Sequence, residues 1–341
     1  MPCMSFWRRI MNKQTQVLPT YLPSLDGLRA LAAWLIVLYH AKAPMISGGY
    51  MAVDVFLVLS GFLITRLLMA ENESTGTINY NAFTLRRLRR LMPALLLMLL
   101  AYLIAAPFFF DYAPWTSHAR DAFWTSLYVI NYATVFGDKV VLLGHVWTLA
   151  VEMQFYLIWP LLFLLIRKAP VRVSLLVVFA LFLAVTGWRA WLATYSGDVW
   201  GFYVRTDARA SGLLLGAFIA MLGRRLPEAW GWLGFLLLGF AFTFFSTRWL
   251  PSAQYGFTVA EVGAALIILS QPRWLAGKVW TWLALTSYGL YLWHYPIMQA
   301  LKPWIEDWRL MVLIGGGLGL LCAMASHYWL ERRFYQRRVA Q

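Results

Sequence analysis

Residues 94–110 read ALLLMLLAYLIAAPFFF, an uncharged stretch that directly follows the basic run LRRLRRLMP at residues 85–93. A helix that spans a bilayer needs roughly 20 successive apolar residues. The stretch, with the end of the basic run, therefore predicts one spanning helix with a positively charged end. Similar runs recur at residues 157–166 and 310–325, so the sequence predicts an all-α, polytopic membrane protein.

The composition supports this fold class. Of the 341 residues, 61% are hydrophobic and 13% are charged, whereas a soluble domain has about 25% charged residues. The net charge of +14 is compatible with nucleic acid, but a membrane protein gathers such charge in its cytoplasmic loops. We therefore expect no nucleic-acid partner. Cys3 and Cys322 lie far apart and predict neither a disulfide framework nor a metal site.

The apolar runs predict ten spans. These lie near residues 27–45, 50–70, 91–110, 145–166, 173–195, 207–223, 229–247, 254–270, 281–300 and 309–330. Residues 121–136 are apolar but short and contain Asn131, so we predict a re-entrant or surface helix there.

The basic residues orient these spans. With the N-terminus in the cytoplasm, most of the 29 Lys and Arg residues fall on the cytoplasmic side, as the positive-inside rule predicts. A full span at 121–136 would put the cluster Arg167–Arg172 and every later basic loop outside. We therefore expect both termini in the cytoplasm. The expected domains are a cytoplasmic segment at 1–20, a ten-helix membrane domain at 21–334 and a cytoplasmic tail at 335–341.

Ionisable residues inside spans are functional candidates by default, and the first group is Asp26, Arg29 and His40. Asp26 and Arg29 are three residues apart and can pair on a helix. Arg29 and His40 are eleven apart, which is close to three helical turns, so they face the same way about 16 Å apart. We expect them to line one groove, with His40 deeper. The alternative is a core histidine bonded to a backbone carbonyl.

Two further acids belong to predicted spans. Asp54 lies at the outer end of the second span, close enough in the hairpin to orient His40. The alternative for Asp54 is an acid that the helix dipole stabilises. Glu152 lies seven residues after His145 and shares its helix face, with Tyr156 nearby. A buried carboxylate is either paired or protonated, so an ion pair with Arg or His is the structural alternative for Glu152.

Two more motifs carry polar side chains. Ser287, Tyr291 and His294 form a stripe on one face of the ninth span, which lines a cavity or bonds neighbouring helices. The arginine run of the third span either contacts lipid headgroups or, together with Arg29, clamps the phosphates of a ligand such as coenzyme A. The arginines of this run are Arg86, Arg87, Arg89 and Arg90.

Taken together, these segments resemble acyltransferase family 3, the bacterial membrane O-acyltransferases, from about residue 21 to 334. The matching motifs occur in the family's order. They are LDGLR at 25–29 with His40, VDVFLVLSGFLI at 53–64, the arginine run at 86–93, WTLAVEMQFY at 147–156, DAR at 207–209 with LLLG at 213–216, SYGLYLWHYP at 287–296 and LE at 330–331.

The chain departs from the family's pattern at two motif positions and in one domain. The glutamate motif often has two adjacent acids, and here Met153 is the second residue, so Glu152 is the lone candidate acid. Arg333 stands where Pro is common in the last motif. Some members carry a C-terminal esterase-like domain. Without one, the membrane domain would finish the transfer itself or pass the acyl group to a separate protein.

The resemblance implies acyl transfer from cytoplasmic acyl-CoA, usually acetyl-CoA, to a hydroxyl of a cell-surface or lipid-linked glycan outside the bacterial inner membrane. With the geometry above, it suggests that Arg29 and the arginine run hold the CoA phosphates. His40 would be the general base or acyl carrier, with Asp54 and Glu152 as its catalytic partners. His145, Tyr156, Ser287, Tyr291 and His294 are expected to line the substrate site. The alternative function is transport or flipping of a lipid-linked glycan, for which repeats or broken helices would be evidence.

Overall fold

The computed structural model describes residues 21–196 and 201–335, most of which are helical, with no β-strand among them. The predicted cytoplasmic segment 1–20 lies outside the described residues, as does the predicted tail except Tyr335. A helix occurs at each of the ten predicted spans. Six segments are long and apolar enough to cross a membrane: Gly49–Thr75, Tyr80–Phe109, Leu143–Ile166, Val171–Tyr195, Ser252–Ser270 and Trp308–Phe334. The all-α, polytopic fold is thereby confirmed.

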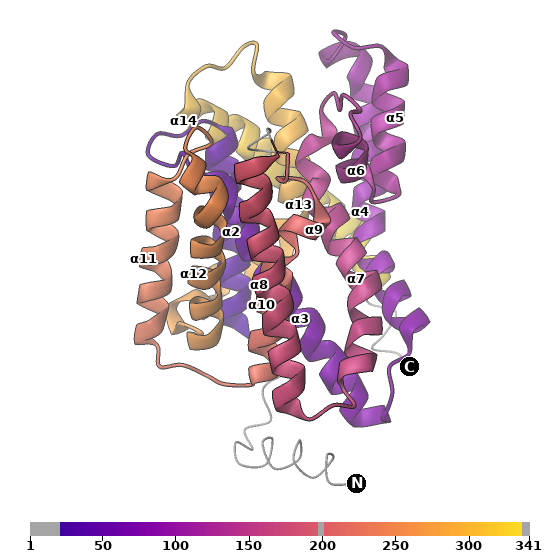
Figure 1. Ribbon diagram of the computed structural model, residues 1–341. Helices are drawn as coiled ribbons and strands as arrows, with labels where there is room; N and C mark the ends of the chain where they lie inside the picture. Colours follow the sequence, from indigo (N-terminus) through magenta and orange to yellow (C-terminus); the bar gives the residue numbers. More distant parts are fainter. Residues whose placement is uncertain (1–20, 197–200, 336–341) are drawn as a thin grey trace.

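The long elements run alongside one another in a bundle (Figure 1). Their bounds are α2 Pro23–His40, α3 Ala52–Thr75, α4 Tyr80–Phe109, α7 Trp147–Ile166, α8 Val171–Tyr195, α10 Ser211–Leu222, α11 Ala229–Phe244, α12 Phe257–Ser270, α13 Lys278–Leu301 and α15 Gly317–Ser326. Several shorter elements continue the long helices without a break: η1 Gly49–Met51, η2 Leu143–Val146 and η3 Ser252–Gly256 lead into α3, α7 and α12, and α14 Trp308–Leu310, η5 Met311–Gly316, η6 His327–Glu331 and α16 Arg332–Tyr335 extend α15 at its two ends. The short helices α9 Thr206–Arg209 and η4 Arg273–Ala276 lie in connections.

Residues 115–135 form two short helices, α5 (Trp115–Ser126) and α6 (Ile130–Val135). They lie together at the upper right of Figure 1, beside the end of α4. A twelve-residue helix is only about 18 Å long, so α5 is too short to cross a bilayer. The segment is therefore not an eleventh span. Asn131 attaches α6 to the bundle, because its side chain hydrogen bonds to Thr206 Oγ1 at 3.0 Å and to the Val204 carbonyl at 3.2 Å.

Small residues set the closest helix contact. A Cβ atom at Gly61 of α3 would lie 1.9 Å from the Leu213 carbonyl oxygen of α10, and one at Gly216 would lie 2.1 Å from the Val58 carbonyl oxygen. Only glycine fits at either position, as is typical of helix contacts in membranes. This contact anchors α3, which carries residues of the candidate site.

The described chain begins and ends on the same side of the bundle. Tyr21, which precedes α2, and Arg332, which opens α16, line the same cavity. An even number of spans requires this arrangement, and it agrees with the ten predicted spans.

Candidate active site

One cavity of about 720 Å³ lies among α2, α3, α4, α7, α13 and the C-terminal helices, and we call it the arginine cavity. Its cationic groups are Arg29, Arg87, Arg90 and Arg332. Arg29 Nη1 pairs with Asp26 Oδ1 at 3.1 Å, as the spacing predicted. Four guanidinium groups around one cavity suit a ligand with several negative charges, because each can bind phosphate oxygens in a forked geometry.

The arginine run divides between two faces of α4. Arg87 and Arg90 are three residues apart and share the face toward the cavity. Arg86 and Arg89 each precede them by one residue, about 100° around the helix. Arg86 pairs instead with Glu71 at 2.5 Å, and Arg89 is not among the residues that line the cavity. Arg86 and Arg89 therefore do not line this cavity, and their predicted part in holding a ligand stays a prediction.

Glu152 lies in the arginine cavity, which it lines together with Tyr156 and Ser287. Ser60 Oγ donates to Glu152 Oε1 at 2.8 Å, and the Tyr156 hydroxyl donates to Oε2 at 3.1 Å. Hydroxyls, rather than the ion pair considered above, are thus its direct partners. Ser287 donates to the carbonyl of Ala284 in its own helix at 2.8 Å.

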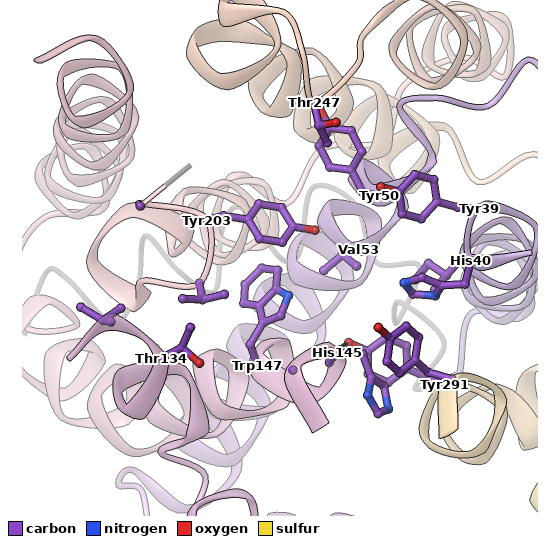
Figure 2. Close-up of a pocket in the computed structure, with 16 residues that line it drawn as sticks. Tyr39, His40, Tyr50, Val53, Thr134, His145, Trp147, Tyr203, Thr247 and Tyr291 are labelled. Atoms are coloured by element: carbon purple, nitrogen blue, oxygen red, sulfur yellow. Dashed lines mark hydrogen bonds between the residues drawn. The ribbon is translucent and has the colours of Figure 1, made fainter. Parts of the chain in front are cut away.

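A second cavity of about 560 Å³, the aromatic cavity, lies on the other side of the bundle's middle. Figure 2 shows the imidazole of His40 on one side of it and the rings of Tyr203 and Trp147 on the other. None of its 16 lining residues, all from the described part of the chain, is Asp, Glu, Lys or Arg. Its rings are those of Tyr39, His40, Tyr50, His145, Trp147, Tyr203, Tyr291 and Tyr295.

The two cavities share Val53 and Tyr291 in their walls. The Tyr291 hydroxyl donates to the His145 carbonyl oxygen and accepts from Thr148 Oγ1, which lies 2.6 Å away. Arg29 lines one cavity and His40 the other, so the single groove expected from α2 is two chambers with a partition. His145 and Glu152, predicted to share a face, likewise lie in different chambers because α7 begins between them.

His40 has a different partner from the predicted one. Its Nδ1 lies 2.9 Å from Nε2 of His294. Asp54, expected to orient His40, instead accepts from Arg209 Nη2 at 2.8 Å, and both side chains are 0% exposed. Asp54 lies in the first turn of α3, so the helix dipole stabilises it as well. A fully buried guanidinium needs this carboxylate, and the prediction that Asp54 contacts His40 is wrong.

His294 and His145 are placed by backbone carbonyls. His294 Nδ1 donates to the Leu290 carbonyl at 2.9 Å, and His145 Nε2 donates to the Leu292 carbonyl at 3.3 Å. His145 lines the aromatic cavity, as does Tyr291. His294 is 0% exposed and lines neither cavity, so its expected place in a cavity wall is wrong. The described residues contain no group of three His, Cys, Asp or Glu side chains that would hold a metal ion.

Four residues in or next to the two cavities were not predicted as site residues: Arg332, Trp147, Tyr203 and Arg209. Arg332 lines the arginine cavity. Its position after the last span had predicted only that it lies on the cytoplasmic side. Trp147 and Tyr203 line the aromatic cavity, and Arg209 lies behind both rings, 5.3 and 5.4 Å from their centres. Trp147 and Arg209 fall within quoted motifs, which marked their positions but not their contacts.

Known proteins are similar in sequence to this chain over most of its length. The family model described as "Acyltransferase domain" matches residues 22–328. A peptidoglycan O-acetyltransferase of Listeria monocytogenes is 33% identical over 87% of this chain and 52% of its own length. A Staphylococcus aureus protein named a putative O-acetyltransferase is 29% identical over 94% of this chain and 58% of its own length.

The chain thus spans somewhat more than half the length of these relatives. No solved structure matches it. The family model covers nearly all of the ten-helix bundle and both cavities. The chain therefore belongs to the acyltransferase family that this domain model describes.

Proposed function

We propose that this chain is a membrane O-acyltransferase that moves an acetyl group from acetyl-CoA to a hydroxyl of a cell-surface or lipid-linked glycan. The observation that carries the proposal is the pair of cavities. One is lined by four arginines, the other by aromatic rings and His40, and the two meet at Val53 and Tyr291. A transferase needs two such sites, one for a charged donor and one for a neutral acceptor.

The arginine cavity is the donor site in this proposal. Coenzyme A carries several phosphate charges, and Arg29, Arg87, Arg90 and Arg332 supply cations for them. The uncharged pantetheine arm would extend toward Val53 and Tyr291. Basic residues concentrate on the cytoplasmic side of bacterial membrane proteins. We therefore assign the arginine cavity to the cytoplasmic side of the bacterial inner membrane, where acetyl-CoA is available.

The aromatic cavity is the acceptor site. Its tyrosines and tryptophan offer flat apolar faces with polar edges, which suit the apolar faces and hydroxyls of a sugar. The Listeria relative is named for peptidoglycan, and a glycan of the cell surface is the acceptor class proposed here. The acyl group would go directly to this glycan or first to a separate protein.

His40 is the catalytic base in this proposal. Its imidazole takes the proton of the acceptor hydroxyl while the hydroxyl oxygen attacks the thioester carbonyl. The new ester C–O bond forms, the thioester C–S bond breaks, and the proton passes from His40 to the departing sulfur. Coenzyme A leaves as a thiol, and His40 is neutral again. Such a base contributes about 10²–10⁴ in rate. An acyl-His40 intermediate would use the same ring, and rapid acid quenching with peptide mass spectrometry would detect it.

Calorimetry and a transfer assay on the protein in lipid nanodiscs test the proposal. We expect acetyl-CoA to bind, acetyl-pantetheine to bind much more weakly because it lacks the phosphates, and peptidoglycan fragments to gain acetyl groups. The alternative, transport of a lipid-linked glycan, requires no acetyl-CoA site. Absence of both acetyl-CoA binding and acetyl transfer would therefore refute the enzyme assignment in favour of the transporter. Mass spectrometry of surface glycans from cells with and without the gene would identify the acceptor.

A further inference from the structure

The second histidine of the site, His294, is fully buried in α13 behind His40. Both of its ring nitrogens have hydrogen-bond partners. Nδ1 lies 2.9 Å from the carbonyl oxygen of Leu290, one turn back in the same helix, and Nε2 lies 2.9 Å from His40 Nδ1. The ring centres are 5.1 Å apart and the ring planes are inclined by only 29°, so the two imidazoles meet edge to edge at these two nitrogens.

The Leu290 carbonyl decides which nitrogen of His294 carries the proton. A carbonyl oxygen only accepts hydrogen bonds, so His294 Nδ1 must be an N–H donor. In a neutral imidazole the other nitrogen then has a lone pair. His294 Nε2 is therefore the acceptor of the bond to His40, and His40 Nδ1 is its donor. The same rule applied to neutral His40 puts the lone pair on its Nε2.

A doubly protonated His294 would reverse this direction, but its surroundings oppose it. The ring is 0% exposed, and none of the ion pairs among the described residues includes it. Asp54, the carboxylate that was predicted beside His40, is bonded to Arg209 instead. An isolated buried cation is costly, so the neutral form is the one that this environment stabilises.

We infer that His294 is a positioning residue that holds His40 in the Nδ1–H tautomer, with the Nε2 lone pair directed to the aromatic cavity that His40 lines. This inference rests on the proposed function. It assigns to a neutral imidazole, backed by the Leu290 carbonyl, the orienting role that a carboxylate has in many hydrolases. The arrangement places no net charge beside the resting base, and the same bond persists when His40 Nε2 accepts the acceptor's proton.

Two substitutions at this position separate orientation from folding. In His294→Gln the side-chain amide oxygen reaches the place of Nε2 and still accepts from His40 Nδ1. In His294→Asn the shorter amide can bond to the Leu290 carbonyl but does not reach His40. Acetyl transfer should survive largely in the Gln variant and fall about 10²-fold in kcat in the Asn variant, the typical contribution of an oriented base. The KM for acetyl-CoA should stay unchanged in both, because the donor occupies the other cavity.

¹⁵N NMR of the ¹⁵N-histidine-labelled protein in nanodiscs determines the tautomer of His40 and does not depend on an activity assay. The chain has five histidines, and His40→Gln identifies the His40 signals by their loss. We expect wild-type His40 to show a protonated Nδ1 and an unprotonated Nε2, and the Asn variant to show a mixture of tautomers. A protonated Nε2 in resting wild-type protein, or an Asn variant as active as wild type, would overturn the inference. A wild-type protein that shows this tautomer yet transfers no acetyl group would instead count against the proposed function alone.

Discussion

The arginine cavity and the aromatic cavity differ in almost every side chain, although they meet at Val53 and Tyr291. The first has four guanidinium groups and three carboxylates in its wall, whereas the described lining of the second has no formal charge. A single permeation path for one substrate would have similar chemistry at both ends. The contrast instead suits two substrates, one charged and one uncharged, that enter from opposite sides and react where the two cavities meet.

The largest expected effect falls on the aromatic side. His40→Ala should reduce acetyl transfer by about 10²–10⁴-fold and leave acetyl-CoA affinity unchanged, because His40 lines only the aromatic cavity. Calorimetry and the transfer assay measure the two quantities on the same preparation, and a thermal melt reports folding. Loss of donor binding in this variant would mean that the two cavities are one site.

The second effect concerns the buried ion pair behind the wall of the aromatic cavity. Asp54→Asn leaves Arg209 as an uncompensated buried charge behind Trp147 and Tyr203 and should cost about 3–5 kcal/mol of stability. Asp26→Asn is the matched control, because the Asp26–Arg29 pair is 19% exposed on each side and opens onto the arginine cavity, so its loss should cost less than that of the fully buried pair. Denaturant titrations of both variants in detergent check this, and equal losses would contradict the assignment of Asp54 to a structural ion pair.

The third effect tests the donor side with two neighbouring residues. Arg90→Ala removes a guanidinium from the arginine cavity and should weaken acetyl-CoA binding roughly tenfold, as a charged hydrogen bond is worth about 1.5–3 kcal/mol. Arg89→Ala changes a likewise exposed neighbour that does not line the cavity and should leave the dissociation constant as it is. The run would be a lipid contact, rather than a donor clamp, if both variants bound acetyl-CoA like wild type.

The smallest effect concerns the partition. Tyr291→Phe removes the bonds to the His145 carbonyl and Thr148 while keeping the ring. Loosening the wall should raise hydrolysis of acetyl-CoA without acceptor by a few fold, since a neutral hydrogen bond contributes about 1 kcal/mol. Thr148→Val should act in the same direction through one of the two bonds, and Thr148→Ser should not. Thiol release measured with and without acceptor distinguishes these outcomes, and a Phe variant with unchanged hydrolysis would show that these bonds do not limit access.

Local periodicity predicted only some of the features that lie on one helix, since Arg29 and His40 share α2 yet line different cavities. The Asp26–Arg29 pair, the ten helices and the break at residues 121–136 all follow from spacing and apolar length. Contacts between helices did not follow. His40 and His294 are 254 residues apart, and either Asp54 or His294 is a chemically reasonable partner for an imidazole. Only the packing of α13 on α2 and of α10 on α3 decides between them.

The division of the arginine run shows the same limit at shorter range. The spacing of Arg87 and Arg90 establishes that they share a face of α4, but not which face meets the cavity. The partition had no signal in the sequence either, because Tyr291 belonged to a polar stripe whose neighbours were unknown. Val53 is one apolar residue among many, and only three-dimensional packing places it between two cavities.

The wall at Val53 and Tyr291 has a consequence for the energetics of the whole cell. A continuous aqueous path through this bundle would conduct protons and ions, and each elementary charge that crosses releases about 2.3 kcal/mol per 100 mV of membrane potential. If the proposed function holds, the protein passes an acetyl group across the bilayer and must remain an electrical insulator throughout its cycle. Two cavities that share only Val53 and Tyr291 in their walls would satisfy that demand, since a covalent group can cross a gap that remains closed to hydrated ions.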